Sequence, residues 1–139
     1  MPKTAKMWVF SPRKPSAPKV PPSVKADVLQ KASELVETIL KPKHIQPAPA
    51  PHKFQHNYIA DIYTKWYRHY FYFCAKYMVP GPNALMPFFE AKFARLEYTG
   101  MNQFNLAFMR HTGEWVEIYP GLTLGKCLAA IQDESWFHP

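Results

Sequence analysis

Apolar and polar residues alternate through most of the second half of the chain. The alternation starts at Asn57 and is interrupted by turn residues at 80–83, 99–102, 111–113 and 120–121. Successive side chains of a strand point to opposite faces, so a period of two predicts strands. Strands joined by short turns usually pair with their neighbours in order. We therefore expect an antiparallel meander.

Five strands and a final helix are predicted in this part. The strand bounds are 58–67, 70–79, 88–98, 103–110 and 114–119. Arg68 and His69 would form a tight turn without glycine. Thr123 is the expected N-cap of the final helix, because a threonine hydroxyl can accept a hydrogen bond from a backbone N–H of the first turn. The apolar face of that helix would be formed by Leu124, Cys127, Leu128 and Ile131.

An amphipathic helix is predicted before the strands, over residues 23–40. Ser23 is its expected N-cap, and Pro42 is expected to stop it. Its apolar stripe would be formed by Val24, Val28, Ala32, Val36 and Leu40. The fold class is therefore α+β: a five-stranded antiparallel meander with an N-terminal and a C-terminal helix, which cover one face of the sheet.

The chain divides into three segments. Residues 1–22 form an extended Pro/Lys-rich arm, because six prolines exclude a helix there. Residues 23–56 hold the first helix and a linker rich in proline and histidine, and residues 57–139 hold the sheet and the C-terminal helix. The arm also contains an apolar group, Met7 to Phe10, whose Trp8 is expected to dock on a surface.

Positive charge is confined to the N-terminal part. Residues 1–56 hold ten Lys and Arg and three acids, a net charge of +7, whereas residues 57–139 hold seven of each. A basic arm on a neutral domain is typical of proteins attracted to polyanions. A basic tail that only increases solubility explains the same asymmetry.

Ten aromatic residues lie between Phe54 and Tyr77. Alternation places Tyr70 and Tyr72 on one face of the hairpin and two phenylalanines on the other. Tyrosines interleaved with the cations Lys65, Arg68 and Lys76 would suit single-stranded nucleic acid, with rings for bases and cations for phosphates. The alternative is that the first helix covers the tyrosine face.

No catalytic or metal-binding motif is found. Cys74 and Cys127 lie in apolar surroundings, where a thiol is unreactive, and free thiols favour a cytoplasmic location. His52 and His56 lie in the proline-rich linker without enough partners for zinc. No apolar run is long enough to span a membrane. We expect a protein that is not an enzyme and has no cofactor.

Many residues of the third strand and beyond resemble a bacterial family of small α+β domains of unknown function. The residues that carry the resemblance are Glu90–Phe93, Tyr98, Asn105–Leu106, Met109–Arg110, Trp115, Tyr119–Pro120, Leu122–Leu124, Leu128–Ile131 and Asp133–Glu134. The resemblance covers about residues 58–137. It implies the fold and no activity, and the arm and first helix depart from it. Phe93 and Trp115 are expected in the core.

Two functions are compatible with these observations. One is a non-catalytic nucleic-acid-binding or ribonucleoprotein-associated protein, for RNA or DNA. The other is an accessory subunit of a larger assembly that docks through its arm on an acidic protein surface. The predicted binding residues are Lys3, Lys6, Trp8, Phe10, Arg13, Lys14, Lys19, Lys65, Arg68, Tyr70, Tyr72 and Lys76.

Overall fold

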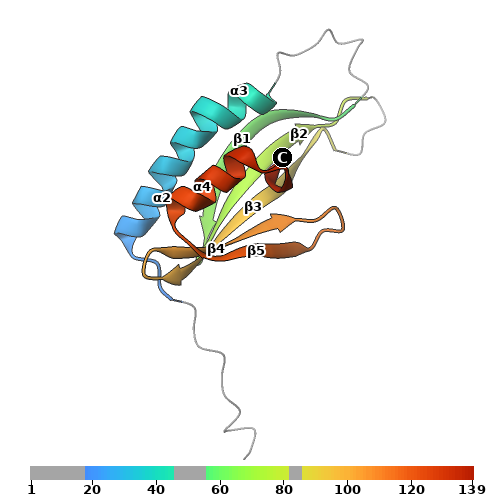
Figure 1. The fold of residues 1–139 in the computed structure, drawn as a ribbon. Helices are drawn as coiled ribbons and strands as arrows, with labels where there is room; N and C mark the ends of the chain where they lie inside the picture. Colours follow the sequence, from blue (N-terminus) through green and yellow to red (C-terminus); the bar gives the residue numbers. More distant parts are fainter. Residues whose placement is uncertain (1–17, 46–55, 82–85) are drawn as a thin grey trace, which may run out of the picture.

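The fold is a five-stranded antiparallel sheet with helices on one face, as predicted. The computed structural model describes residues 18–45, 56–81 and 86–139. Most of the predicted arm, the linker residues 46–55 and the turn residues 82–85 lie outside this description. Figure 1 shows the N-terminal and C-terminal helices side by side over the sheet.

The strands follow one another across the sheet in the order β1-β2-β3-β4-β5, and every neighbouring pair is antiparallel. The meander is therefore confirmed. The bounds of the strands are Tyr58–Tyr67 (β1), Tyr70–Met78 (β2), Phe88–Gly100 (β3), Gln103–Met109 (β4) and Trp115–Leu122 (β5).

The end predicted for the fifth strand, at residue 119, is wrong. β5 continues through Pro120 and Gly121 to Leu122, which pairs with Phe104. A proline is tolerated here because β5 lies at the edge of the sheet. The Gly121 N–H donates to the side-chain Oδ1 of Asn105 at 3.0 Å, so a side chain supplies the partner that extends the strand.

The first helix is longer than predicted. It consists of α2 (Pro22–Leu35), a π-helical turn η2 (Val36–Leu40) and α3 (Lys41–His44). The predicted cap is wrong, because Pro21 is the N-cap and no side chain caps the first turn. Proline is favoured at the next position, Pro22, since its fixed φ suits a helix and the first N–H groups have no intrahelical partner.

Pro42 does not end this helix. A proline within a helix lacks an N–H and collides with the carbonyl four residues earlier. The wider π turn directly precedes it, and there the Lys41 N–H bonds the carbonyl of Val36, five residues back. The proline thus falls in the first turn of α3, where its missing N–H is tolerated.

The core lies between the sheet and the helices. Phe71 and Phe73 are fully buried, together with Val28, Ala32 and Val36 from the helix stripe. Tyr70 and Tyr72 point to the opposite face, which we call the outer face, and are only half-buried. The interpretation that the first helix covers the tyrosines is therefore wrong: its apolar stripe packs on the phenylalanines, which have no hydroxyl to satisfy.

The C-terminal part closes this core. α4 (Leu124–Asp133) is capped by Thr123, whose hydroxyl accepts from the Lys126 N–H at 3.3 Å, which confirms the predicted cap. A short 3-10 helix, η4 (Ser135–Phe137), then buries Phe137. In the described part of the chain, no helix is both long and apolar enough to cross a membrane.

Two neighbouring residues of β2 test the assignment of the faces. Phe73→Ala should lower the free energy of unfolding by about 3–5 kcal/mol, because it leaves a cavity in the core. Tyr72→Ala removes a ring of similar size from the outer face and should cost less than half as much. Urea denaturation of the two variants measures the difference, and equal losses would contradict the assignment.

Candidate nucleic-acid interface

Aromatic rings and a cation form a continuous cluster on the outer face. We call this cluster, Tyr70, Tyr72, Arg95 and Trp115, the platform. The ring centroids of Tyr70 and Tyr72 lie 6.1 Å apart, and those of Tyr72 and Trp115 lie 5.8 Å apart. All four side chains are half-buried, so each ring keeps part of its surface open to solvent.

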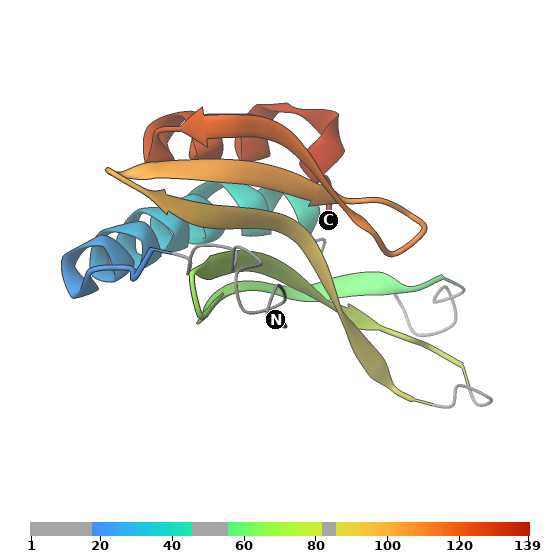
Figure 2. The same ribbon diagram turned by 90° about the horizontal axis from the view of Figure 1, so that it is seen from below.

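A β-bulge in β3 brings Arg95 to this cluster. Phe73 pairs with Ala94 and Cys74 pairs with Lys92, so Phe93 is an extra residue between two pairs. Phe93 and Ala94 are both buried, although they are consecutive. The strand therefore changes phase at the bulge, and Arg95 reaches the outer face opposite Tyr72. Figure 2 shows β3 bending between the β1–β2 pair and the β4–β5 pair.

Arg95 is held by rings and not by an acid. Its guanidinium carbon lies 4.8 Å from the ring centroid of Tyr70 and 4.9 Å from that of Trp115. Within the described residues it makes no salt bridge, and its buried Nε has no hydrogen-bond partner. A cation–π contact orients a cation without cancelling its charge. Arg95 therefore keeps its positive charge for a ligand at the surface of the platform.

Beside the platform, a carboxylate holds two lysines. Glu90 accepts hydrogen bonds from Tyr63, from Lys65 at 2.9 Å and from Lys92 at 3.2 Å. The Tyr63 hydroxyl, with the two ammonium groups, lowers the pKa of Glu90 to about 2. Lys92 also lies 5.7 Å from the ring centroid of Tyr72. Glu90 therefore holds Lys65 and Lys92 next to the rings and partly neutralises their charge.

The other predicted cations of the hairpin lie around the platform. Lys76 is on the outer face, 4.4 Å from the ring centroid of Phe88. Arg68 is in the β1–β2 turn, 5.3 Å from the ring centroid of Tyr67. Lys19 lies at the start of the described chain, near the same turn. The remaining predicted binding residues fall outside the described residues: Lys3, Lys6, Trp8, Phe10, Arg13 and Lys14.

Two platform residues were missed or misassigned by sequence reasoning. Trp115 was expected in the core, and this is wrong: it pairs with Met109 on the outer face and is half-buried. Phe93, expected in the core, is there. Arg95 was not predicted, because strict alternation places it on the same face as Phe93. The available signal was its position between apolar neighbours, Ala94 and Leu96, where a cation usually marks the other face.

The two cysteines are free and buried. Cys74 and Cys127 are both buried, and burial raises the pKa of the first to about 11 and of the second to about 12. Both thiols are therefore protonated at neutral pH, as expected for unreactive cysteines. Across the described ranges, no three histidine, cysteine or acidic side chains lie close enough to share a metal ion.

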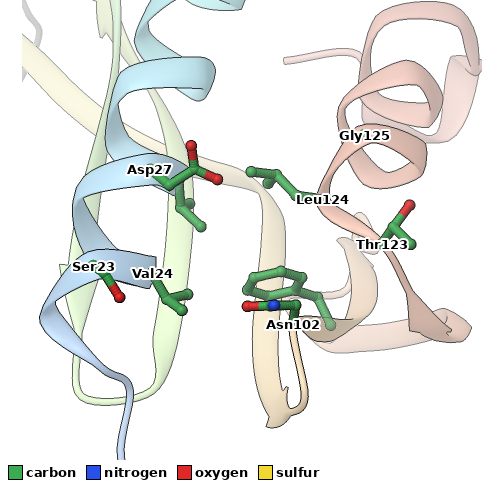
Figure 3. A pocket seen from close by; sticks show the side chains of 9 residues that line it. Ser23, Val24, Asp27, Asn102, Thr123, Leu124 and Gly125 are labelled. Carbon is green, nitrogen blue, oxygen red and sulfur yellow. The ribbon is translucent and has the colours of Figure 1, made fainter.

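A separate cleft lies between the N-terminal ends of α2 and α4. It has a volume of about 410 Å³, and Figure 3 shows Val24, Asp27 and Leu124 among the side chains around it. Phe104 contributes to its apolar lining. The cleft contains a carboxylate and no cation, and none of the predicted binding residues lines it. The outer face is therefore the better candidate for a polyanionic ligand.

Comparison with known families identifies a family for this chain and is silent about activity. Residues 19–139 match the domain of unknown function DUF3024. The chain belongs to this family. The match begins before α2, so the first helix is part of the family domain, which corrects the narrower resemblance found over residues 58–137. Comparisons with curated proteins and with solved structures gave no significant match.

We call Glu90 and its three hydrogen-bond donors, Tyr63, Lys65 and Lys92, the Glu90 cluster. The lowered pKa of Glu90 predicts that the stability of the fold decreases in acid. Because the folded-state pKa of Glu90 lies near 2 and its ordinary value is 4.5, the carboxylate stabilises the fold above about pH 4.5 and loses this contribution as the pH falls towards 2. Glu90 is partly exposed, so we expect a loss of only about 1 kcal/mol. Chemical denaturation of the wild type and of Glu90→Gln over this range measures it.

The matched control is Glu117→Gln, which removes an exposed carboxylate from the same face. Glu90→Gln should flatten the acid limb of the stability curve, whereas Glu117→Gln should leave the limb unchanged. Identical curves for the two variants would show that the Glu90 cluster contributes nothing.

Proposed function

We propose that this protein binds single-stranded nucleic acid on its outer face and catalyses no reaction. The observation that carries the proposal is the platform: three aromatic rings around an arginine that has no acidic partner among the described residues. Bases stack on rings irrespective of their sequence, and cations between the rings attract the phosphates. Both cysteines are free, which favours a cytoplasmic location for this function.

The charge of the described outer face is nearly balanced, so the platform by itself would bind weakly. Glu90 holds Lys65 and Lys92, and Glu97 lies 3.2 Å from the ring nitrogen of His69. The long-range attraction would come mainly from the N-terminal part, which carries the net charge of the chain. The proposal therefore assigns stacking to the platform and electrostatic attraction to the arm.

A second function, docking on another protein, is favoured by a different observation. At the far end of the β2–β3 hairpin, Met86, Phe88 and Phe89 are exposed, with 62%, 43% and 41% of their surface accessible. Phe89 stacks on Tyr77 with ring centroids 5.2 Å apart, so several apolar side chains gather at this end of the hairpin. Such surfaces often form protein interfaces. The protein would then be an accessory subunit, with arm residues Trp8 and Phe10 as further anchors.

The platform can be tested with two tryptophans. Trp115→Ala should weaken binding to a fluorescent oligo(dT) or oligo(U) by about 1–3 kcal/mol, the usual contribution of one stacked base. Trp136→Ala is the control, because Trp136 also has a ring accessible to solvent but lies in η4 on the helix side of the sheet. Fluorescence anisotropy at about 50 mM salt, where the electrostatic attraction is strong, measures both. Equal affinities of the two variants, or no binding by the wild type, would refute the proposal.

The arm can be tested by its effect on salt dependence. Deleting residues 1–17 removes Lys3, Lys6, Arg13 and Lys14 and none of the described core residues, which begin at Val20. Each phosphate contact adds about 0.7 to the salt slope on a single strand, so the slope should fall by at most about 3. The double variant Trp8→Ala, Phe10→Ala should have a smaller effect. The accessory-subunit function predicts the opposite order. The Trp8→Ala, Phe10→Ala variant would then weaken binding to a captured protein partner, and loss of the arm cations would leave that binding unchanged.

A further inference from the structure

The cavity beside the β1–β2 turn has the chemistry of a phosphate site. We infer that it binds one phosphate group of the nucleic-acid strand, an inference that rests on the proposed function. The cavity has a volume of about 300 Å³. It is lined by Pro18, Lys19, Val20, Lys25, Arg68 and His69. We call it the turn pocket.

Three cations from three separate elements meet at the turn pocket. Lys19 comes from the segment before α2, Lys25 from the first turns of α2 and Arg68 from the β1–β2 turn. No acidic residue is part of the lining. In the described part of the chain, none of the three makes a salt bridge, whereas Lys31 and Lys41 are each paired with a carboxylate. Three cations that are not paired with a carboxylate therefore gather here, and the Glu97 carboxylate lies 3.2 Å from the ring nitrogen of His69 at the edge of the pocket.

Aromatic contacts orient two of these cations. The Lys25 ammonium lies 5.9 Å from the ring centroid of Trp66, and the Trp66 Nε1–H donates to the carbonyl of Lys25 at 3.3 Å. The Arg68 guanidinium lies 5.3 Å from the ring centroid of Tyr67. These contacts restrict the side chains without neutralising them. An arginine and a lysine held in this way, with Lys19 beside them, suit the several acceptor oxygens of a phosphate group.

One residue of the turn pocket, His69, contacts the first ring of the platform. His69 lines the pocket, and its ring centroid lies 4.1 Å from that of Tyr70, the first ring of the platform. A strand whose base stacks on Tyr70 would therefore place its neighbouring phosphate beside Lys25 and Arg68. This arrangement defines one end of the bound strand, because only this end of the ring row carries the three cations.

The turn itself does not require an arginine. Arg68 has a φ of 56°, in the left-handed region that favours glycine. Arg68→Gly should therefore remove the charge without destabilising the turn, and thermal melting should confirm that the variant is folded. The matched control is Lys126→Gln, which removes one exposed positive charge from α4 and does not line the turn pocket.

The test is a salt titration of oligonucleotide binding with the full chain. Arg68→Gly should weaken binding about tenfold at low salt, the usual effect of one charge-assisted hydrogen bond, and lower the salt slope by about 0.7. Lys126→Gln should change neither quantity. The bound phosphate could be at the end of the strand or within it. Oligonucleotides with a 5′-phosphate, with a 3′-phosphate and with neither distinguish these two sources. A loss confined to one phosphorylated end indicates a terminal phosphate, and an equal loss on all three indicates an internal one.

Titration with inorganic phosphate, followed by amide chemical shifts in NMR spectra, tests the pocket independently of the platform. Shifts at Lys19, Lys25 and Arg68 that disappear in Arg68→Gly support the phosphate site, even if no oligonucleotide binds and the proposed function fails. If Arg68→Gly and Lys126→Gln behave alike in both experiments, the phosphate site is refuted. The proposed function would still stand in that case, provided that Trp115→Ala weakens oligonucleotide binding.

Discussion

The pleat of β2 determines both layers of this domain. It sends Phe71 and Phe73 to one face and Tyr70 and Tyr72 to the other. The phenylalanines have no polar atom, so they can be buried completely under α2 and α4, and they form the centre of the core. The tyrosines carry hydroxyls that water can satisfy, which makes the outer face the natural place for them. Core and candidate interface are thus two sides of the same strand.

The bulge at Phe93 brings Arg95 to the outer face. An extra residue in β3 allows Phe93 and Ala94 to be buried together and turns Arg95 outward. On β4 the next position in this row is Ala107, which is buried and small, so the large ring of Trp115 can lie across the strands and reach Tyr72. Arg95 then has a ring on either side and makes no ion pair within the described residues. A local irregularity of the backbone therefore brings together the rings and the cation of the platform.

The contacts of the described cations fall into two classes, and Lys92 makes both kinds. Lys31, Lys41, Lys65 and Lys92 are paired with carboxylates and mainly adjust the surface charge of the domain. Others, such as Arg68 and Arg95, lie against aromatic rings, where they are oriented and remain charged. The second class lies along the outer face and at the β1–β2 turn, which is why we assign the ligand to this side of the molecule.

The sequence by itself determined the number of strands, their order and the cap of the last helix, because alternation, short turns and a threonine hydroxyl act over a few residues. Local patterns also placed Tyr70 and Tyr72 on a common face. They were wrong in several places. A π turn directly before Pro42 accommodates that proline within the helix, Asn105 supplies a partner that extends β5, and Trp115 lies outside the core. Only the tertiary structure brought Arg95 to the tyrosines and Lys19 and Lys25 to the β1–β2 turn. The physical reason is that a bulge changes which side of a strand each later residue faces, and the pairing of neighbouring strands sets where the bulge lies.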